Sequence, residues 1–259
     1  MKDQRPTLLA FAPMINVEAT RCVLEYYAIP YREVDRLFGW ANIRTFFHGG
    51  YGEVPVLYGR GVRLSGPAPI VRRFDAERGS PRLLPPEEPL RSEIEAEWKR
   101  FLNDLASGVA PLAYYHLLPQ TKAMIKSFGE PISPFGRAVL PFTYPALRAL
   151  FRVLLRLTPA RIEDCRSRMN AILDSVDRRL ASHSYMVGDH ITLADIGMIS
   201  ASAPVLLPDH YAKWVPPLAD LPPAFTAIVA ETRTRPCAAY ADRIYAEINQ
   251  HAAARPRMI

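Results

Sequence analysis

The chain has 259 residues, of which 49% are hydrophobic, 22% charged and 10% aromatic. This composition is that of a globular protein, and the length suits one large domain or two modest ones. The 13 glycines and 25 prolines follow no period, which excludes collagen-like and low-complexity chains. Three widely spaced cysteines, Cys22, Cys165 and Cys237, argue against a disulfide framework or a zinc knuckle, so we expect a reducing, cytoplasmic setting.

The net charge is +6, and much of the excess comes from arginines between Arg137 and Arg168. Arg148, Arg152 and Arg156 recur every four residues with leucines between them, which predicts a helix with one basic and one apolar face. We interpret this helix as a solvated surface over a packed core; contact with a membrane surface or with nucleic acid is the alternative. Because we find no nucleic-acid motif, signal peptide or apolar run of the ~20 residues that span a bilayer, we expect neither a nucleic-acid nor a membrane partner.

Residues 1–79 predict a small α/β domain in which strands and helices alternate. Apolar runs of strand length predict strands at 7–12, 31–34, 54–58 and 61–64, the last two joined as a hairpin. Helical spacing of apolar residues predicts helices at 17–27 and 68–77, and Pro30 ends the first of them.

A proline-rich linker is predicted at 80–89, and beyond it the strand signals stop. Apolar residues at helical spacing then continue almost to the C-terminus, so we expect residues 90–259 to form an all-helical domain. Within it, the segment 121–145 is rich in proline, glycine and phenylalanine, and we interpret it as an irregular excursion between helices.

The most specific local pattern lies at residues 191–196 (ITLADI). Thr192 is placed to cap a helix, and Asp195, three residues later, is placed to accept a bond from the backbone of the cap. Ile191 and Ile196 occupy the two positions of a hydrophobic staple. This pattern predicts a folding device and gives Asp195 no catalytic role.

Two segments together resemble the glutathione transferase superfamily: 52–57 (GEVPVL) and 187–195 (VGDHITLAD). The proline-rich linker between them agrees with that family, and so does the segment 204–245, so the resemblance covers nearly the whole chain. It implies an N-terminal thioredoxin-like domain followed by an all-helical domain, with the active site in the cleft between them. It also implies a homodimer and glutathione as co-substrate.

The resemblance implies that Pro55 is cis and that the backbone of Val54 pairs with the cysteinyl part of glutathione. In the family, a Tyr, Ser or Cys after the first strand stabilises the thiolate of glutathione. Here the Ser or Cys position falls on Met14 and the Tyr position on Ala10, and neither side chain can donate a hydrogen bond to sulfur. Asn16 is the nearest polar candidate, with a helix N-cap as the alternative reading.

A second departure concerns the γ-glutamyl group, which the family holds with a Ser preceded by Glu or Asp. The register of this chain gives Gly66 and Pro67 at those positions, with Ser65 one step earlier. Proline has neither a hydroxyl nor a backbone N–H. Either Ser65 substitutes through a shifted turn, or the glutathione site is altered or lost.

Tyr114, Tyr115 and His116 lie near the end of the first long helix of the helical domain. The resemblance places the pocket for the second substrate there, so we expect aromatic walls and one titratable group. The leading hypothesis is a glutathione-transferase-like enzyme that conjugates or isomerises a small apolar electrophile, with weakened or no use of glutathione. The alternatives are a glutathione-independent isomerase or cyclase and a non-catalytic binding protein on the same scaffold.

Overall fold

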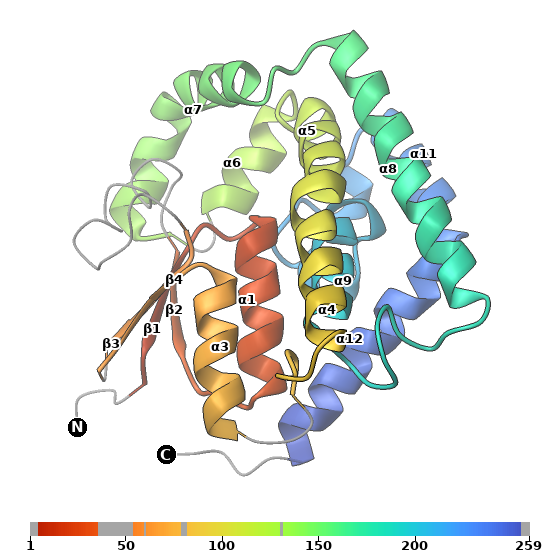
Figure 1. Cartoon of the computed structure of the whole chain (residues 1–259). Coiled ribbons are helices and arrows are strands. Elements are labelled where there is room, and N and C mark those ends of the chain that lie inside the picture. The colour runs from red at the N-terminus through yellow and green to blue at the C-terminus, as the bar shows by residue number, and fades with distance from the viewer. Residues whose placement is uncertain (1–4, 36–53, 60, 79–81, 130–131, 255–259) are drawn as a thin grey trace.

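The computed structural model describes residues 5–35, 54–59, 61–78, 82–129 and 132–254. A four-stranded sheet with the order β2-β1-β3-β4 forms the N-terminal part (Figure 1). β1 (Thr7–Ala10) is parallel to β2 (Arg32–Asp35) and antiparallel to β3 (Val56–Gly59), which pairs antiparallel with β4 (Val62–Ser65). Each strand lies within two residues of its predicted position.

Helices α1 (Ile15–Tyr26) and α3 (Pro67–Arg78) lie side by side against this sheet (Figure 1). α1 begins two residues earlier than predicted, because the chain turns tightly after β1 and the N–H of Met14 donates to the carbonyl of Phe11 (3.0 Å). The Val54–Pro55 peptide bond is cis. Gly52 and Glu53, which begin the GEVPVL segment, lie outside the described residues.

The rest of the described chain is helical (Figure 1). α4 (Leu90–Lys99), a π-helical stretch η1 (Arg100–Leu105) and α5 (Ala106–Leu117) follow one another without a break in helical backbone. The remaining helices are α6 (Thr121–Gly129), α7 (Pro134–Leu154), α8 (Pro159–Leu180), α9 (Leu193–Leu206), α10 (Asp209–Ala212), the 3-10 turn η2 (Leu218–Asp220), α11 (Pro223–Arg233) and α12 (Pro236–Ala254).

The segment 121–145, predicted to be irregular, is helical instead, and that prediction was wrong. α6 and most of α7 occupy its described residues. Pro134 stands in the first turn of α7, where a proline costs no hydrogen bond, while Pro141 and Pro145 lie inside the helix on its exposed side. Interior prolines bend a helix and leave carbonyl groups unpaired, and on an exposed face water replaces the lost bonds.

The core is centred on α9, all of whose residues are buried against α1, α4 and α5. The predicted capping box is confirmed: the backbone N–H of Thr192 donates to Asp195 Oδ2 (2.6 Å), and so does the Thr192 hydroxyl (2.8 Å). The other carboxylate oxygen of Asp195 accepts bonds from the N–H of Met186 (2.7 Å) and the hydroxyl of Tyr240. One buried carboxylate thereby ties the start of α9 to the loop before it and to α12.

A second buried carboxylate joins the sheet part to the helical part. Asp75 on α3 accepts bonds from the Tyr27 hydroxyl, beyond the end of α1, and from the N–H groups of Leu83 (3.0 Å) and Leu84 (2.8 Å). The carbonyl of Leu83 in turn accepts from the N–H of Leu193 at the start of α9 (2.8 Å). The segment between α3 and α4 is therefore held to both parts of the molecule.

Among the described residues, each helix taken alone falls short of the length and apolarity needed to cross a membrane, and only α7 and α8 taken together, bent by 65° at the break between them, meet that test.

Candidate functional site

An apolar cavity of about 250 Å³ lies between the two parts of the molecule. The turn after β1 and the start of α1 form one wall, η1 and α5 form the second, and α6, the end of α7 and the segment after α9 complete it. A cavity of about 150 Å³ holds benzene, so this one has room for a molecule of one or two rings. Sites of this kind, mostly apolar with a few polar groups, are typical of small-molecule binding.

Two of the polar side chains on the cavity wall are already bonded to the protein. The Tyr211 hydroxyl donates to the carbonyl of Pro13 (2.8 Å), and the Ser127 hydroxyl donates to the carbonyl of Trp214 (3.0 Å). Three donors on the wall form no hydrogen bond with a described residue: the side-chain amide of Asn16, the hydroxyl of Tyr114 and the buried indole N–H of Trp214. A buried donor without a partner is costly, so the indole N–H of Trp214 is the position at which a ligand acceptor would gain most.

Tyr114 is held in place by its ring. The ring packs against that of Phe151, which comes from α7, with centroids 4.9 Å apart. Burial, and then the nearby Tyr144, raises the pKa of Tyr114 above its ordinary value. The phenol is therefore neutral at physiological pH and can donate a hydrogen bond.

The turn after β1 supplies no hydroxyl or thiol, so the amide of Asn16, in the first turn of α1, is the nearest side-chain donor that a thiol could meet. Met14 and Asn16 both lie on the cavity, and no residue from Phe11 to Met14 carries a hydroxyl or thiol. Asn16 is not the N-cap of α1, because Met14 holds that position and Asn16 stands in the first turn. Cys22 lies further along α1 and is fully buried.

The residues expected to hold glutathione lie beside the sheet, away from the residues that line the cavity. The carbonyl of Pro55 accepts from the N–H of Gly66 (2.8 Å), and Ser65 has a buried hydroxyl with no partner. Gly66 has a φ of 76°, which favours glycine, and Pro67 begins α3. The buried Ser65 hydroxyl could accept or donate a bond, whereas Gly66 and Pro67 offer a γ-glutamyl group no side-chain charge or hydroxyl. Val54 is buried.

Tyr115 and His116 do not lie on the cavity. They line a separate surface depression with Arg148 and Arg152, and the ring of His116 stacks on that of Phe225 (5.7 Å). Successive residues of a helix are rotated by about 100°, so neighbours on α5 need not all face the cavity. Tyr114 does, and it also borders the depression.

Sequence reasoning singled out neither Tyr211 nor Trp214. Both belong to the segment 204–245, which the resemblance includes. Nothing in the spacing of these two residues, however, shows that this segment packs against α1. The Trp214 ring also receives the guanidinium of Arg21 at 4.1 Å from its centroid. Long-range packing of this kind has no local signal in a single sequence.

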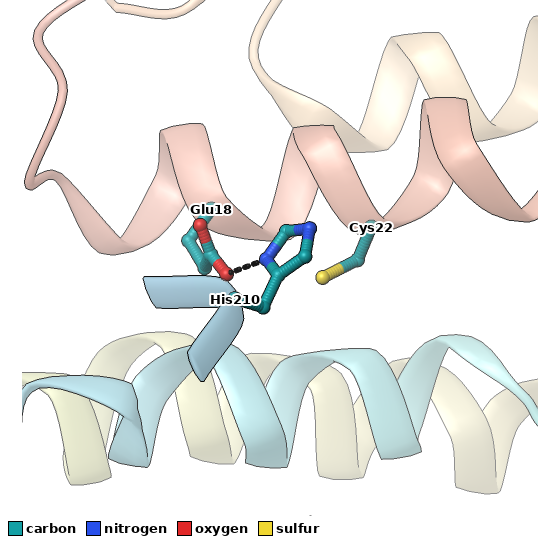
Figure 2. Close-up of side chains that lie close together, drawn as sticks. All are labelled: Glu18, Cys22 and His210. Atoms are coloured by element: carbon teal, nitrogen blue, oxygen red, sulfur yellow. Dashed lines mark hydrogen bonds and ion pairs between the residues drawn. The ribbon is translucent and has the colours of Figure 1, made fainter. Parts of the chain in front are cut away.

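Figure 2 shows a cluster in which Glu18 and Cys22 on α1 face His210 on α10. One donor atom of each lies within 4.8 Å of the others, and the three residue types can bind zinc. However, Nδ1 of His210 is 2.7 Å from Glu18 Oε1, and Nε2 is 2.7 Å from Glu25 Oε2. A ring with a carboxylate at each nitrogen is best satisfied as an imidazolium, which has no lone pair left for a metal.

The surroundings of this cluster agree with an ion-pair network. Burial alone would lower the pKa of His210, but the hydrogen bonds and charges of Glu18 and Glu25 outweigh it and raise the pKa to about 9. Burial would raise the pKa of Glu18, but His210 and Arg21 lower it. Burial, followed by the charges of both glutamates, raises the pKa of Cys22 well above its ordinary value, so its thiol is neutral and a poor metal ligand.

No protein-family model and no curated sequence matches the chain. Solved structures do resemble it. A glutathione S-transferase from Rhodospirillum rubrum F11 has a TM-score of 0.59 at 18% identity, over 92% of this chain and 90% of that one. A glutathione S-transferase from Sinorhizobium meliloti 1021 has a TM-score of 0.59 at 17% identity, over 93% and 92%.

The beta-etherase LigF from Sphingobium sp. strain SYK-6 is also similar, with a TM-score of 0.57 at 15% identity, over 93% of this chain and 99% of that one. All three likenesses extend over both the sheet part and the helical part. The predicted fold class, a thioredoxin-like domain followed by an all-helical domain, is therefore confirmed: this chain has the glutathione S-transferase fold.

Proposed function

We propose that this chain is an enzyme of glutathione-transferase type that holds a small apolar electrophile in the cavity and conjugates or isomerises it. The observation that carries the proposal is the cavity itself, which is apolar, lies between the two parts of the fold and retains three side-chain donors that bond to no described residue. Its size suits a substrate of one or two rings. The transferases and the beta-etherase among the similar structures support the same class of reaction.

Tyr114 is the residue we expect to act on the substrate. Its neutral hydroxyl can donate to a substrate oxygen, and such a bond stabilises negative charge that develops there during attack or enolisation. Trp214, in the segment that follows α10, offers a second N–H group. A carbonyl compound with an apolar body fits this arrangement, because the remaining wall has little to offer a charged group.

The described residues do not fit the thiol and γ-glutamyl ends of glutathione. No hydroxyl or thiol follows β1 in the turn from Phe11 to Met14, and neither Gly66 nor Pro67 has a polar side chain. Val54, the cis Pro55 and the unpaired hydroxyl of Ser65 are the features that could still contact the tripeptide. We therefore propose weak binding of glutathione or none, and we assign it no step.

That mismatch favours a second candidate function, a glutathione-independent enzyme such as an isomerase or cyclase. A non-catalytic binding protein is the third. All three share the cavity and differ in whether the bound molecule is changed and whether glutathione is consumed with it.

Binding to the cavity can be tested with 2-acetylnaphthalene, which has two rings and one carbonyl group. We expect the Ala110→Phe variant, which fills the cavity from α5, to weaken binding at least tenfold, and Tyr114→Phe to weaken it about threefold to tenfold. Ala253→Phe, an exposed change near the end of α12, should bind as the wild type does. Equal binding by the wild type and Ala110→Phe would place the ligand elsewhere and overturn the proposal.

Turnover is tested separately with an aryl enone, 4-phenylbut-3-en-2-one, in the presence and absence of glutathione. Consumption that requires glutathione supports the transferase reaction. Consumption without glutathione supports the independent enzyme instead. Binding without consumption in either mixture supports the non-catalytic protein and contradicts the enzyme.

A further inference from the structure

Helix α7 carries most of the exposed large apolar side chains in the described part of the chain. Phe135, Phe142 and Val153 are 79%, 85% and 74% exposed, and Leu150 and Leu154 are exposed as well. Elsewhere among the described residues, only Leu218 is comparable. A soluble surface rarely gathers such side chains on one element unless the element contacts something apolar.

These side chains share one face of the helix. Phe135, Phe142 and Val153 are spaced by seven and eleven residues, which returns each to the same side of a helix. The opposite side holds Leu140 and Tyr144, which are buried in the protein. α7 lies at the outer edge of the molecule, where it packs mainly on α6 (Figure 1). The apolar face is therefore turned away from the buried side of the helix, toward solvent.

The charges beside this face are all positive. Between residues 131 and 162 the sequence has five arginines and no aspartate or glutamate. Arg152 lies on the flank of the helix between the apolar face and the depression, and the exposed Arg156 follows the helix, whereas the half-buried Arg148 faces the depression beside Tyr115 and His116. None of these three forms an ion pair with a described residue. Their charges are therefore available to an anionic partner.

We propose that the outer face of α7 binds the surface of an anionic lipid membrane. A helix that lies in the headgroup region buries phenylalanine and leucine among the acyl chains and places arginine beside the lipid phosphates, and α7 has both features. A second copy of the chain fits less well, because the same face would meet it with the same arginines. The exposed fractions of the α7 side chains thus favour contact with a membrane surface, which was the alternative interpretation of the arginine spacing.

The position of α7 ties this surface to the cavity. Phe151 and Leu154, at the end of the same helix, form part of the cavity wall. A molecule docked through α7 would hold the cavity beside the lipid surface.

Flotation of the full-length protein with lipid vesicles tests the proposal. We expect binding to vesicles of phosphatidylcholine with about a third phosphatidylglycerol, and little binding to phosphatidylcholine alone. Arg152→Gln with Arg156→Gln should weaken binding about twentyfold or more, since each arginine contributes about fivefold. Phe135→Ser with Phe142→Ser should weaken it at least a hundredfold, since burying each ring contributes roughly tenfold or more.

Matched controls show whether binding depends on α7 or only on the total charge and exposed apolar surface of the protein. Arg72→Gln with Arg178→Gln removes the same charge from exposed sites on α3 and α8, and Leu218→Ser removes the exposed leucine outside α7; both should bind as the wild type does. Far-UV circular dichroism checks that every variant is folded. Binding by the wild type to neither vesicle at low salt would overturn the proposal, as would equal binding by the α7 variants.

Light scattering without lipid tests whether a second copy of the chain covers this face instead. If the wild type is a dimer that Phe135→Ser with Phe142→Ser converts to a monomer, the face is covered by a second copy and the membrane proposal is wrong.

Discussion

At the scale of single residues, the charge of His210 depends on two glutamates from a distant part of the chain. Its ring bonds to Glu18 and Glu25 on α1 and stacks on Tyr245 from α12, whose hydroxyl also donates to Glu18 (3.1 Å). Three elements far apart in sequence therefore meet at one protonated imidazole. A buried pair of this kind stabilises the fold only while both partners carry their charges.

The stability of the protein should follow the titration of this network. Because the pKa of His210 is raised from 6.5 to about 9 on folding, its contribution is fully present below pH 6.5 and is lost as the pH rises to 9. Glu18, whose pKa is lowered on folding, contributes above pH 4.5 and loses its contribution as the pH falls below that value. Urea unfolding should show a decline on the order of 3 kcal/mol between pH 6.5 and 9.

The matching variant is His210→Gln, which should be less stable near pH 6 and should lack this decline. His183→Gln, a change at an exposed histidine, should keep it. Parallel pH profiles for the wild type and His210→Gln would show that the imidazolium is not formed.

Glutathione affinity is a second property that single residues control. We expect calorimetry to find a dissociation constant in the millimolar range or no binding, because Gly66 and Pro67 lack the groups that would meet the γ-glutamyl charges. Hydrogen bonds to charged groups contribute about 1.5–3 kcal/mol each, and about 1.4 kcal/mol is tenfold in affinity. Gly66→Glu with Pro67→Ser should therefore strengthen binding at least tenfold.

The positive φ of Gly66 strains any other residue there, at a cost of about 1–2 kcal/mol, so a thermal melt must first show that this double variant is folded. Ala76→Glu adds the same charge at an exposed position further along α3 and should leave glutathione binding unchanged. A micromolar constant for the wild type would mean that Ser65, or another group, takes over the contact.

At the scale of elements, the start of α9 can be tested on its own. Thr192→Ala should lower the free energy of unfolding by about 0.5–2 kcal/mol, because the cap loses its hydroxyl while Asp195 keeps its bonds to Met186 and Tyr240. Thr158→Ala at the exposed start of α8 should cost less, since water can replace that cap. Denaturant titrations of both variants test this prediction. An unchanged unfolding midpoint for Thr192→Ala would argue against the capping box.

Local signals explain which elements could be predicted. The capping box at Thr192, the strand runs and the proline after α1 act within a few residues, so the sequence alone places them well. Pro141 and Pro145 misled the prediction for 121–145, because their cost depends on whether water or protein surrounds the freed carbonyl groups. On the exposed side of α7 that cost is small, and no single-sequence pattern reveals such exposure.

At the scale of the whole molecule, the resemblance of two short segments was enough for the fold class, while the cavity was only partly predictable. Met14, Asn16 and Tyr114 were singled out and lie on its wall. Tyr115 and His116 were singled out with them and lie elsewhere, because one or two steps along α5 turn a side chain away. The parts of the cavity wall that come from α7 and from the segment after α9 could not be predicted, because they depend on tertiary packing.

That packing joins the two parts through α1, which contacts α9 and α12 as well as α3. The Tyr211 hydroxyl bonds the carbonyl of Pro13, and His210 bonds Glu18 and Glu25, so the sheet part cannot unfold without exposing buried charge in the helical part. Exposing such a charge without its partner costs several kcal/mol. We therefore expect both parts to unfold in one transition.

The three buried cysteines can test whether the two parts unfold together, because Cys22 lies in α1, Cys165 in α8 and Cys237 in α12. Pulse labelling with a thiol reagent across a urea gradient, read by mass spectrometry, gives a separate midpoint for each thiol. The three midpoints should coincide with one another and with the loss of the far-UV circular dichroism signal. If Cys22 became reactive at clearly lower urea than the other two, the sheet part would unfold independently, and the network around His210 would not couple the two parts.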